Sequence, residues 1–251
     1  MARFQFGRLL YHVRSLFLEE PYWNFKTVID IENRYGVKST FFFLNESIPW
    51  HPLQISNWKL SLGNYDIRDE RIQEMIRYLD SNGWEIGVHG SYRSFRDVNL
   101  LTEEKRVLER VVGHSVAGIR QHYLNLDDKT WRLQSKAGFL YDASYGYTRD
   151  IGFKGGKRGV FSPPGAPGFF VVPLPLMDIC AVLQPWKKIV SVIDEVESSD
   201  GVLVLNWHQE RMNENEFPGF THLYIRIIEE CLHRGGTFRT IHQCVNALRS
   251  I

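Results

Sequence analysis

The chain has 251 residues, of which 43% are hydrophobic and 14% aromatic, enough to build a substantial core. Its 30 basic and 29 acidic residues give a formal net charge of +1, which argues against binding nucleic acid or an anionic membrane through bulk charge. The 3 cysteines are widely spaced without a Cys-x-x-Cys pair, so neither a disulfide framework nor a thiolate zinc site is predicted. No apolar run is long enough for a membrane span and no signal peptide is visible, so we expect a cytoplasmic protein.

The first half of the sequence alternates predicted helices with short apolar strands. Helical periodicity covers residues 8–17 and 21–35, and Gly36 is a typical residue to follow a helix. The aromatic and β-branched run 37–44 predicts a buried parallel strand, and residues 45–65 carry the turn signals of a long loop over its carboxyl end. Further helices are predicted at 66–82, from a cap at Thr102–Glu104 to Gly113, and at 130–137, and further strands at 83–89, 116–119 and 139–141.

The second half continues the same alternation. Residues 152–168 are rich in glycine and proline and predict a loop, whose Gly155-Gly156-Lys157 lacks the strand-to-helix context of a phosphate-binding loop. Extended structure is expected at 171–175, strands at 201–208 and 237–240, and helices at 186–196, 224–232 and 241–248. Because the sequence shows no repeat, linker or charge block, we expect a single domain over residues 1–251.

Polar side chains stand where successive predicted strands end. These residues are His89, Arg120 together with His122, Asp142 and His208. The carboxyl ends of the strands in a β/α barrel meet at one mouth, so we expect these side chains to share a site. An isolated histidine is more often a structural residue than a metal ligand, and it is the common position that indicates function.

The segments around these residues resemble the polysaccharide deacetylases of the NodB type, carbohydrate esterase family four, over about residues 21–245. The matching segments are Tyr35-Gly36-Val37-Lys38-Ser39-Thr40-Phe41-Phe42, Gly83-Trp84-Glu85-Ile86-Gly87-Val88-His89, Arg120-Gln121-His122-Tyr123-Leu124, Ala137-Gly138-Phe139-Leu140-Tyr141-Asp142 and Leu205-Asn206-Trp207-His208. The resemblance implies an α/β fold, a distorted (β/α)7-type barrel. It also implies a hydrolase that uses a divalent metal, usually zinc, to remove acetyl groups from an acetylated sugar or polysaccharide.

The resemblance also implies a role for each matching residue. His89 corresponds to a metal-binding histidine and His208 to the general acid. Arg120 corresponds to the arginine that orients a catalytic aspartate, and Asp142 to the acidic residue that tunes the acid and the arginine. From the residues alone, Asp142 could instead cap a helix and Arg120 could be a buried ion-pair residue. The expected substrate-binding residues are Tyr123, Trp207, Ser91 and Tyr92.

Two parts of the family pattern are not found. The first motif, a strand that ends in paired aspartates, has no counterpart in residues 1–20. Four residues after His89, where the family has a second metal-binding histidine, the sequence has Arg93, and a guanidinium does not ligate a metal. His122 is therefore a candidate replacement ligand, and the alternative is a groove residue that hydrogen-bonds the sugar.

These departures leave two interpretations. The sequence is either a fragment that lacks the first barrel strand, which fits better, or a protein that has lost the chemistry. We therefore expect the chain as given to hydrolyse acetylated sugars poorly or not at all. The principal interpretation is a zinc-dependent hydrolase acting on an acetylated sugar or glycan, and the alternative is a non-catalytic carbohydrate-binding pseudoenzyme.

Overall fold

The structure is a computed structural model that describes residues 22–46, 48, 53, 60, 65–199 and 201–249. Its strands form a five-stranded parallel sheet in the order β1-β2-β3-β4-β5 and a two-stranded parallel sheet of β6 and β7. The strands are β1 (Thr40–Leu44), β2 (Glu85–Gly90), β3 (Gly118–Gln121), β4 (Tyr141–Gly146), β5 (Phe170–Leu174), β6 (Leu176–Met177) and β7 (Leu205–Asn206). The α-helices are α2 (Phe25–Tyr35), α4 (Glu70–Ser81), α5 (Val98–Val112), α6 (Thr130–Lys136), α7 (Asp178–Ala181), α8 (Trp186–Ser199), α9 (Phe220–His233) and α10 (Ile241–Arg249).

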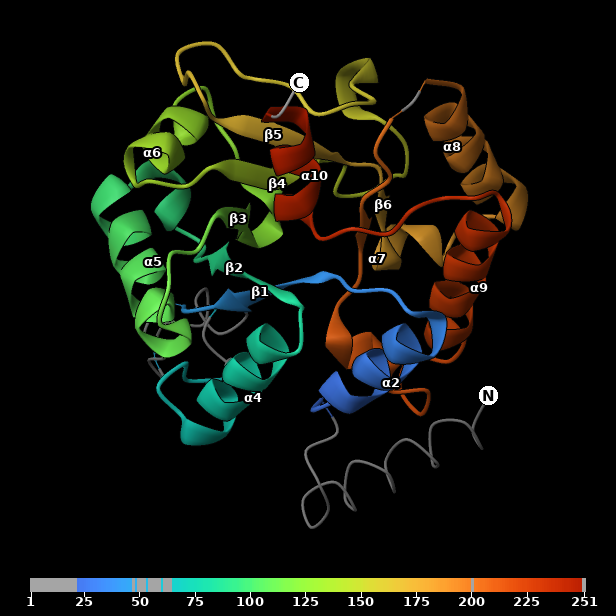
Figure 1. The fold of residues 1–251 in the computed structure, drawn as a ribbon, viewed down its shortest axis with the longest axis horizontal. Coiled ribbons are helices and arrows are strands. Elements are labelled where there is room, and N and C mark those ends of the chain that lie inside the picture. The colour runs from blue at the N-terminus through green and yellow to red at the C-terminus, as the bar shows by residue number, and fades with distance from the viewer. Residues whose placement is uncertain are drawn as a thin grey trace.

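The helices surround the strands, as Figure 1 shows, with α4, α5 and α6 on one side and α2, α8 and α9 on the other. Strand and helix alternate along most of the chain, and neighbouring strands are parallel, so the predicted α/β architecture is confirmed. In the part of the chain that the structure describes, no helix is both long and apolar enough to cross a bilayer.

The two sheets are not joined by backbone pairing between β1 and β7. Among the described residues β1 pairs only with β2, and β7 pairs only with β6. Side chains span this seam instead, because Phe41 of β1 and Leu205 of β7 pack against one hydrophobic cluster of α2 and α9 residues. The mouth of the barrel is therefore built from two separately hydrogen-bonded halves.

Polar side chains close the amino-terminal end of the barrel. The carboxylate of Glu85, the first residue of β2, accepts hydrogen bonds from Thr40 Oγ1 at 2.7 Å and from the His242 backbone amide at 2.9 Å. The hydroxyl of Tyr141 donates to the same carboxylate. Because His242 lies in the first turn of α10, these bonds fix the last helix across the strand starts. Gly118 leaves room for the Tyr141 ring, since a Cβ there would lie 2.0 Å from the ring's Cζ.

Several sequence-based boundaries differ from the structure. Helix α5 begins at Val98, where the Asp97 carboxylate caps the amides of Asn99 and Leu100, and not at Thr102. The fourth strand was expected at 139–141 but β4 runs over Tyr141–Gly146, and only Leu205–Asn206 of the expected strand 201–208 is paired. Residues 237–240 form no strand. The expected helix at 8–17 and most of the loop at 45–65 lie outside the described residues.

Candidate active site

His89 is the last but one residue of β2 and lies at the centre of the candidate site. Its Nδ1 is 2.9 Å from the backbone carbonyl oxygen of Arg120, the residue beside it in β3. Its ring packs edge-on against that of His122, with 5.2 Å between ring centroids. Burial, followed by the charges of His122, His208 and Arg120, lowers the pKa of His89 well below its ordinary value. The imidazole of His89 is therefore neutral at physiological pH, and His122 and His208 are close enough to act on it electrostatically.

His208 follows β7 and forms a close pair with Asp178, the residue after β6. One carboxylate oxygen of Asp178 lies 2.9 Å from Nδ1 of His208 and accepts the His208 backbone N–H at 2.8 Å. Asp178 is fully buried, whereas the His208 side chain is 42% exposed. Burial alone would lower the pKa of His208, but the hydrogen bond and charge of Asp178 outweigh it and the pKa is raised. This pairing holds Nδ1 inward and leaves Nε2 as the nitrogen that can exchange a proton.

Arg120 provides a buried positive charge below the mouth. Its Nε donates to the Ala143 carbonyl at 3.0 Å and its Nη1 donates to Asn206 Oδ1 at 2.9 Å. The guanidinium carbon lies 4.4 Å from the centre of the Phe42 ring of β1. Burial lowers the pKa of Arg120 to about 10, so it stays a cation at neutral pH. Arg120 thus contacts both halves of the barrel, because Phe42 belongs to β1 and Asn206 to β7.

Asp142 makes its hydrogen bonds on the helix side of the sheet. It is the second residue of β4, and its carboxylate accepts hydrogen bonds from Ser144 and from Gln134 and Trp131 of α6. Asp142 pairs with Ile119 of β3, and side chains alternate along a strand, so Asp142 points to the helix layer while Arg120, the residue after Ile119, points inward. Asp142 still acts on the Arg120 guanidinium through its charge. The carboxylate that contacts His208 belongs to Asp178. Asp178 directly follows the strand Leu176–Met177, and the sequence did not identify it as a site residue.

Tyr92 and Tyr123 are the two expected substrate-binding residues that lie open to solvent near the histidines. They are 37% and 54% exposed, and their rings meet edge to face with centroids 5.8 Å apart. The Tyr123 ring also packs on the His122 ring at 4.5 Å. Tyr123 has a φ of 56°, a left-handed conformation that is costly for an aromatic residue and that clusters at functional sites. An aromatic surface of this kind suits the apolar face of a sugar ring.

Ser91 and Trp207, the other two expected substrate contacts, are placed elsewhere. Ser91 is fully buried, and its backbone amide donates to both carboxylate oxygens of Glu104 at 3.3 Å. The Trp207 ring packs against Tyr224 and Phe220 of α9, with centroids 5.2 and 6.2 Å apart. Ser91 is thus shielded from solvent and the Trp207 ring packs on α9, so neither belongs to the exposed aromatic surface of Tyr92 and Tyr123.

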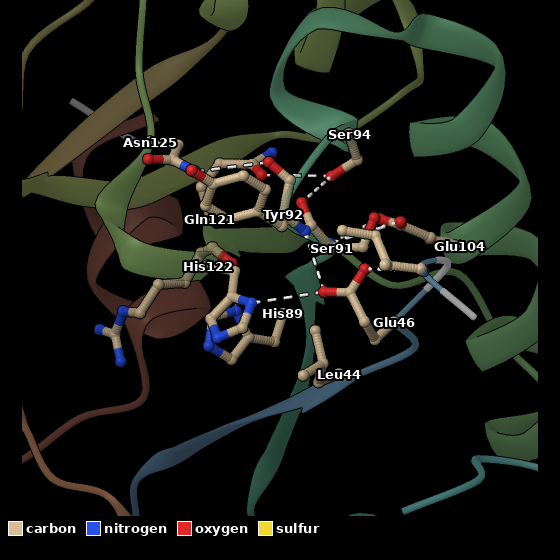
Figure 2. A network of polar contacts seen from close by, with 12 residues as sticks. Leu44, Glu46, His89, Ser91, Tyr92, Ser94, Glu104, Gln121, His122 and Asn125 are labelled. Atoms are coloured by element: carbon tan, nitrogen blue, oxygen red, sulfur yellow. Dashed lines mark hydrogen bonds and ion pairs between the residues drawn. The ribbon is translucent and has the colours of Figure 1, made fainter. Parts of the chain in front are cut away.

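Glu46, two residues after β1, is a carboxylate of the site that the sequence reasoning did not identify. Figure 2 shows it between His122 and the turn after β2. Its Oε2 lies 3.4 Å from His122 Nδ1 and accepts the Tyr92 backbone amide at 3.1 Å. Burial raises the pKa of Glu46, but the interactions with His122 and the backbone amides outweigh it and the pKa is lowered. The only available signal was its place just past the end of a predicted strand.

Comparisons with known proteins come from structure alone. No family model matches the sequence. No curated protein matches it either. A solved structure described as PuuE allantoinase matches with a TM-score of 0.61 and 17% identity, over 87% of this chain and 70% of that chain. A protein from Mycobacterium smegmatis described as a polysaccharide deacetylase matches with a TM-score of 0.52 and 18% identity, over 94% and 89%. A family 4 carbohydrate esterase from Bacillus anthracis matches with a TM-score of 0.51 and 13% identity, over 90% and 77%.

This chain has the polysaccharide deacetylase fold. The expected distorted β/α barrel is thereby confirmed, and at these identities the likeness concerns the fold. The NodB-type resemblance found in the sequence agrees with it. The paired-aspartate motif was sought in residues 1–20, which lie outside the described residues.

The residues present do not fit the zinc ion that this fold family implies. Across the described ranges, no three His, Cys, Asp or Glu side chains are grouped to hold a metal ion. His89 and His122 adjoin each other, with the Arg120 carbonyl and Glu46 facing their Nδ1 atoms, so each offers only Nε2 and the pair supplies two ligands at most. Arg93, in the position of the family's second histidine, is an exposed cation. The buried charge of Arg120, which lowers the pKa of His89, would also oppose a divalent cation there.

Proposed function

We propose that this protein is a hydrolase that removes acetyl groups from an acetylated sugar or polysaccharide. The observation that carries the proposal is the His208–Asp178 pair, an exposed imidazole held by a buried carboxylate at the carboxyl end of the strands. A general acid in this position would protonate the amine or alcohol that leaves when the acetyl bond breaks. The raised pKa of His208 increases the fraction that carries this proton near neutral pH.

Arg120 and the exposed tyrosines support the same proposal. The buried guanidinium provides positive charge near the mouth, which favours the negative charge that develops on the acetyl oxygen during attack. Tyr92 and Tyr123 would bind the sugar beside the histidines through their ring faces. Zinc chemistry is part of the expectation from the family, but the donor set does not fit it and no step is assigned to a metal.

Acetate release from two substrates tests this function. The purified chain would be incubated with an N-acetylated chito-oligosaccharide and with an O-acetylated xylo-oligosaccharide, and products would be separated by mass spectrometry. We expect release from at least one, with His208→Asn lowering kcat by about 10²-fold. His233→Asn, at the exposed end of α9, is the matched control and should retain the rate. Equal rates for His208→Asn and the unaltered protein would contradict the assigned role.

A non-catalytic carbohydrate-binding protein is the second candidate function. It is favoured by the missing metal-ligand group among the described residues together with the exposed Tyr92–Tyr123 pair. Calorimetric titration with the same oligosaccharides separates the two. Binding that depends on Tyr123, without acetate release from either substrate, would support this candidate over the hydrolase.

A further inference from the structure

Glu46 and His122 form a second histidine–carboxylate pair at the mouth. The Glu46 side chain is only 3% exposed, and the Ile48 amide donates to its Oε1 at 3.1 Å while the Tyr92 amide donates to its Oε2. These bonds fix the carboxylate opposite Nδ1 of His122, which is buried and makes no hydrogen bond within the described part of the chain. At 3.4 Å the contact is an ion-pair distance, longer than a typical hydrogen bond. Glu46 is therefore the group that sets the electrostatic surroundings of Nδ1.

The two pairs approach the site from opposite halves of the barrel. Glu46 and His122 follow β1 and β3, whereas Asp178 and His208 follow β6 and β7. His89 and Arg120 link them, because the His89 ring packs against that of His122, its Nδ1 lies at the Arg120 carbonyl, and the Arg120 guanidinium donates to Asn206 of β7. In each pair a buried carboxylate faces Nδ1 of a partly exposed imidazole. Each pair thus directs the same ring nitrogen, Nε2, away from its carboxylate.

We propose that His122, positioned by Glu46, is the general base that activates the attacking water, and that His208, positioned by Asp178, is the general acid, so that hydrolysis needs no metal. The inference rests on the proposed function. Nε2 of His122 removes a proton from water as the water oxygen bonds to the acetyl carbon. The carbon–nitrogen or carbon–oxygen bond to the sugar then breaks, and His208 gives its proton to the leaving atom. Acetate and the free sugar group result, and solvent returns both histidines to their starting states.

This arrangement replaces what the family pattern lacks in this sequence. A metal-bound water needs no strong base, because the ion lowers the pKa of the water. Without a fitting ligand set, the water must be activated by a base, and the neutral Nε2 of an imidazole can act as that base. A carboxylate behind that imidazole stabilises the imidazolium that forms, as it does in other histidine–carboxylate pairs. The expectation of poor activity relied on the missing paired aspartates, one of which would be the catalytic base, and on the missing second histidine; Glu46 supplies a carboxylate behind a different base.

Chelation and substitution at Glu46 test the inference. The protein would be dialysed against EDTA, its metal content measured by mass spectrometry, and kcat and KM determined on the acetylated oligosaccharide with and without added zinc. We expect an unchanged rate after chelation. Glu46→Gln should lower kcat by about tenfold or more and leave KM unchanged, because it removes the charge and keeps the shape. Glu74→Gln, on the exposed face of α4, is the matched control and should behave as the unaltered protein.

Substitution of His122 provides a readout that a purely structural role would not give. His122→Ala should lower kcat by about 10²-fold, and imidazole added to the buffer should restore part of it. If this variant does not fold, as judged by thermal unfolding, His122→Gln and the Glu46→Gln result decide the question. An unaltered kcat in Glu46→Gln would overturn the inference.

The failures of the two proposals can be told apart. Activity that EDTA abolishes and zinc restores, or stoichiometric zinc that is lost in His89→Ala, would overturn the metal-free inference and leave the hydrolase standing. No acetate release from either substrate by the unaltered protein, with or without zinc, would refute the hydrolase itself and the inference with it.

Discussion

The free energy of unfolding of this protein should fall as the pH rises from 5 to 8, and replacing Glu104 by glutamine should abolish part of that fall. Glu104 lies on α5, is 2% exposed, and accepts the Ser91 backbone amide below the turn that carries Tyr92. Burial, together with a smaller effect of the Glu46 charge, raises its pKa from 4.5 to about 7 against hydrogen bonds from Ser91 and Ser94 that lower it. The protonated form is therefore the one that the folded protein prefers.

The magnitude follows from proton linkage. The unfolded chain releases this proton near pH 4.5, and the folded chain holds it until about pH 7. Between these values the folded state binds more protons, so the free energy of unfolding falls as the pH rises. The gap between the two pKa values corresponds to about 3.5 kcal/mol, at about 1.4 kcal/mol for each tenfold change in proton affinity. Glutamine keeps an acceptor oxygen for Ser91 without a titrating group.

Urea unfolding at pH 5 and at pH 8 measures this difference. Because the unfolded chain is already largely deprotonated at pH 5, the stability of the unaltered protein, relative to that of Glu104→Gln, should be about 2.5 kcal/mol lower at pH 8 than at pH 5. Glu103→Gln, an exposed neighbour on the same helix, is the control and should stay within about 0.5 kcal/mol of the unaltered protein at both values. The reasoning would be refuted if Glu104→Gln and the unaltered protein lost stability in parallel over this range.

Two further substitutions test the site and the core. Tyr123→Gly should stabilise the fold by about 1 kcal/mol, because glycine adopts the left-handed φ of this position without strain. The same variant should raise the KM for the acetylated oligosaccharide, and an unchanged KM would exclude Tyr123 from sugar binding. Gly118→Ala should destabilise by about 1–3 kcal/mol in urea unfolding, since its Cβ would displace the Tyr141 ring, whereas Gly159→Ala, with open space around it, should not; equal stability of the two variants would argue against a tight contact.

Much of the fold could be predicted from the sequence because its signals are local. Hydrophobic periodicity and the glycines that end helices, such as Gly36 and Gly113, placed the β/α alternation and put His89 at the end of a buried strand. The expected strand at 237–240 was wrong because local composition does not decide which segments find a backbone partner. The two-residue β7 shows the same limit, since only part of an apolar run pairs.

The pairing of site residues depended on facts that a linear sequence does not contain. Asp142 and Asp178 are both acids near strand residues, and only the direction of each side chain separates the one that contacts α6 from the one that holds His208. Glu46 and His122 are brought together by strands that are not adjacent in the sheet, β1 and β3. Ser91 beside the mouth is buried because α5 places a carboxylate under its amide.

Because β1 and β7 are not paired with each other, the mouth is formed by residues from two separate sheets. The larger sheet and the segments that follow its strands carry His89, His122 and Glu46. The strand pair β6 and β7, two residues long, leads into Asp178 and His208. The Arg120 side chain contacts both sheets. A short ladder opens at less cost than a long one, so the spacing between the two histidine–carboxylate pairs is less firmly held than the geometry within either. A ligand that contacts both sheets would therefore stabilise the folded barrel in proportion to its affinity and concentration, and the largest reduction in local opening would be at β7.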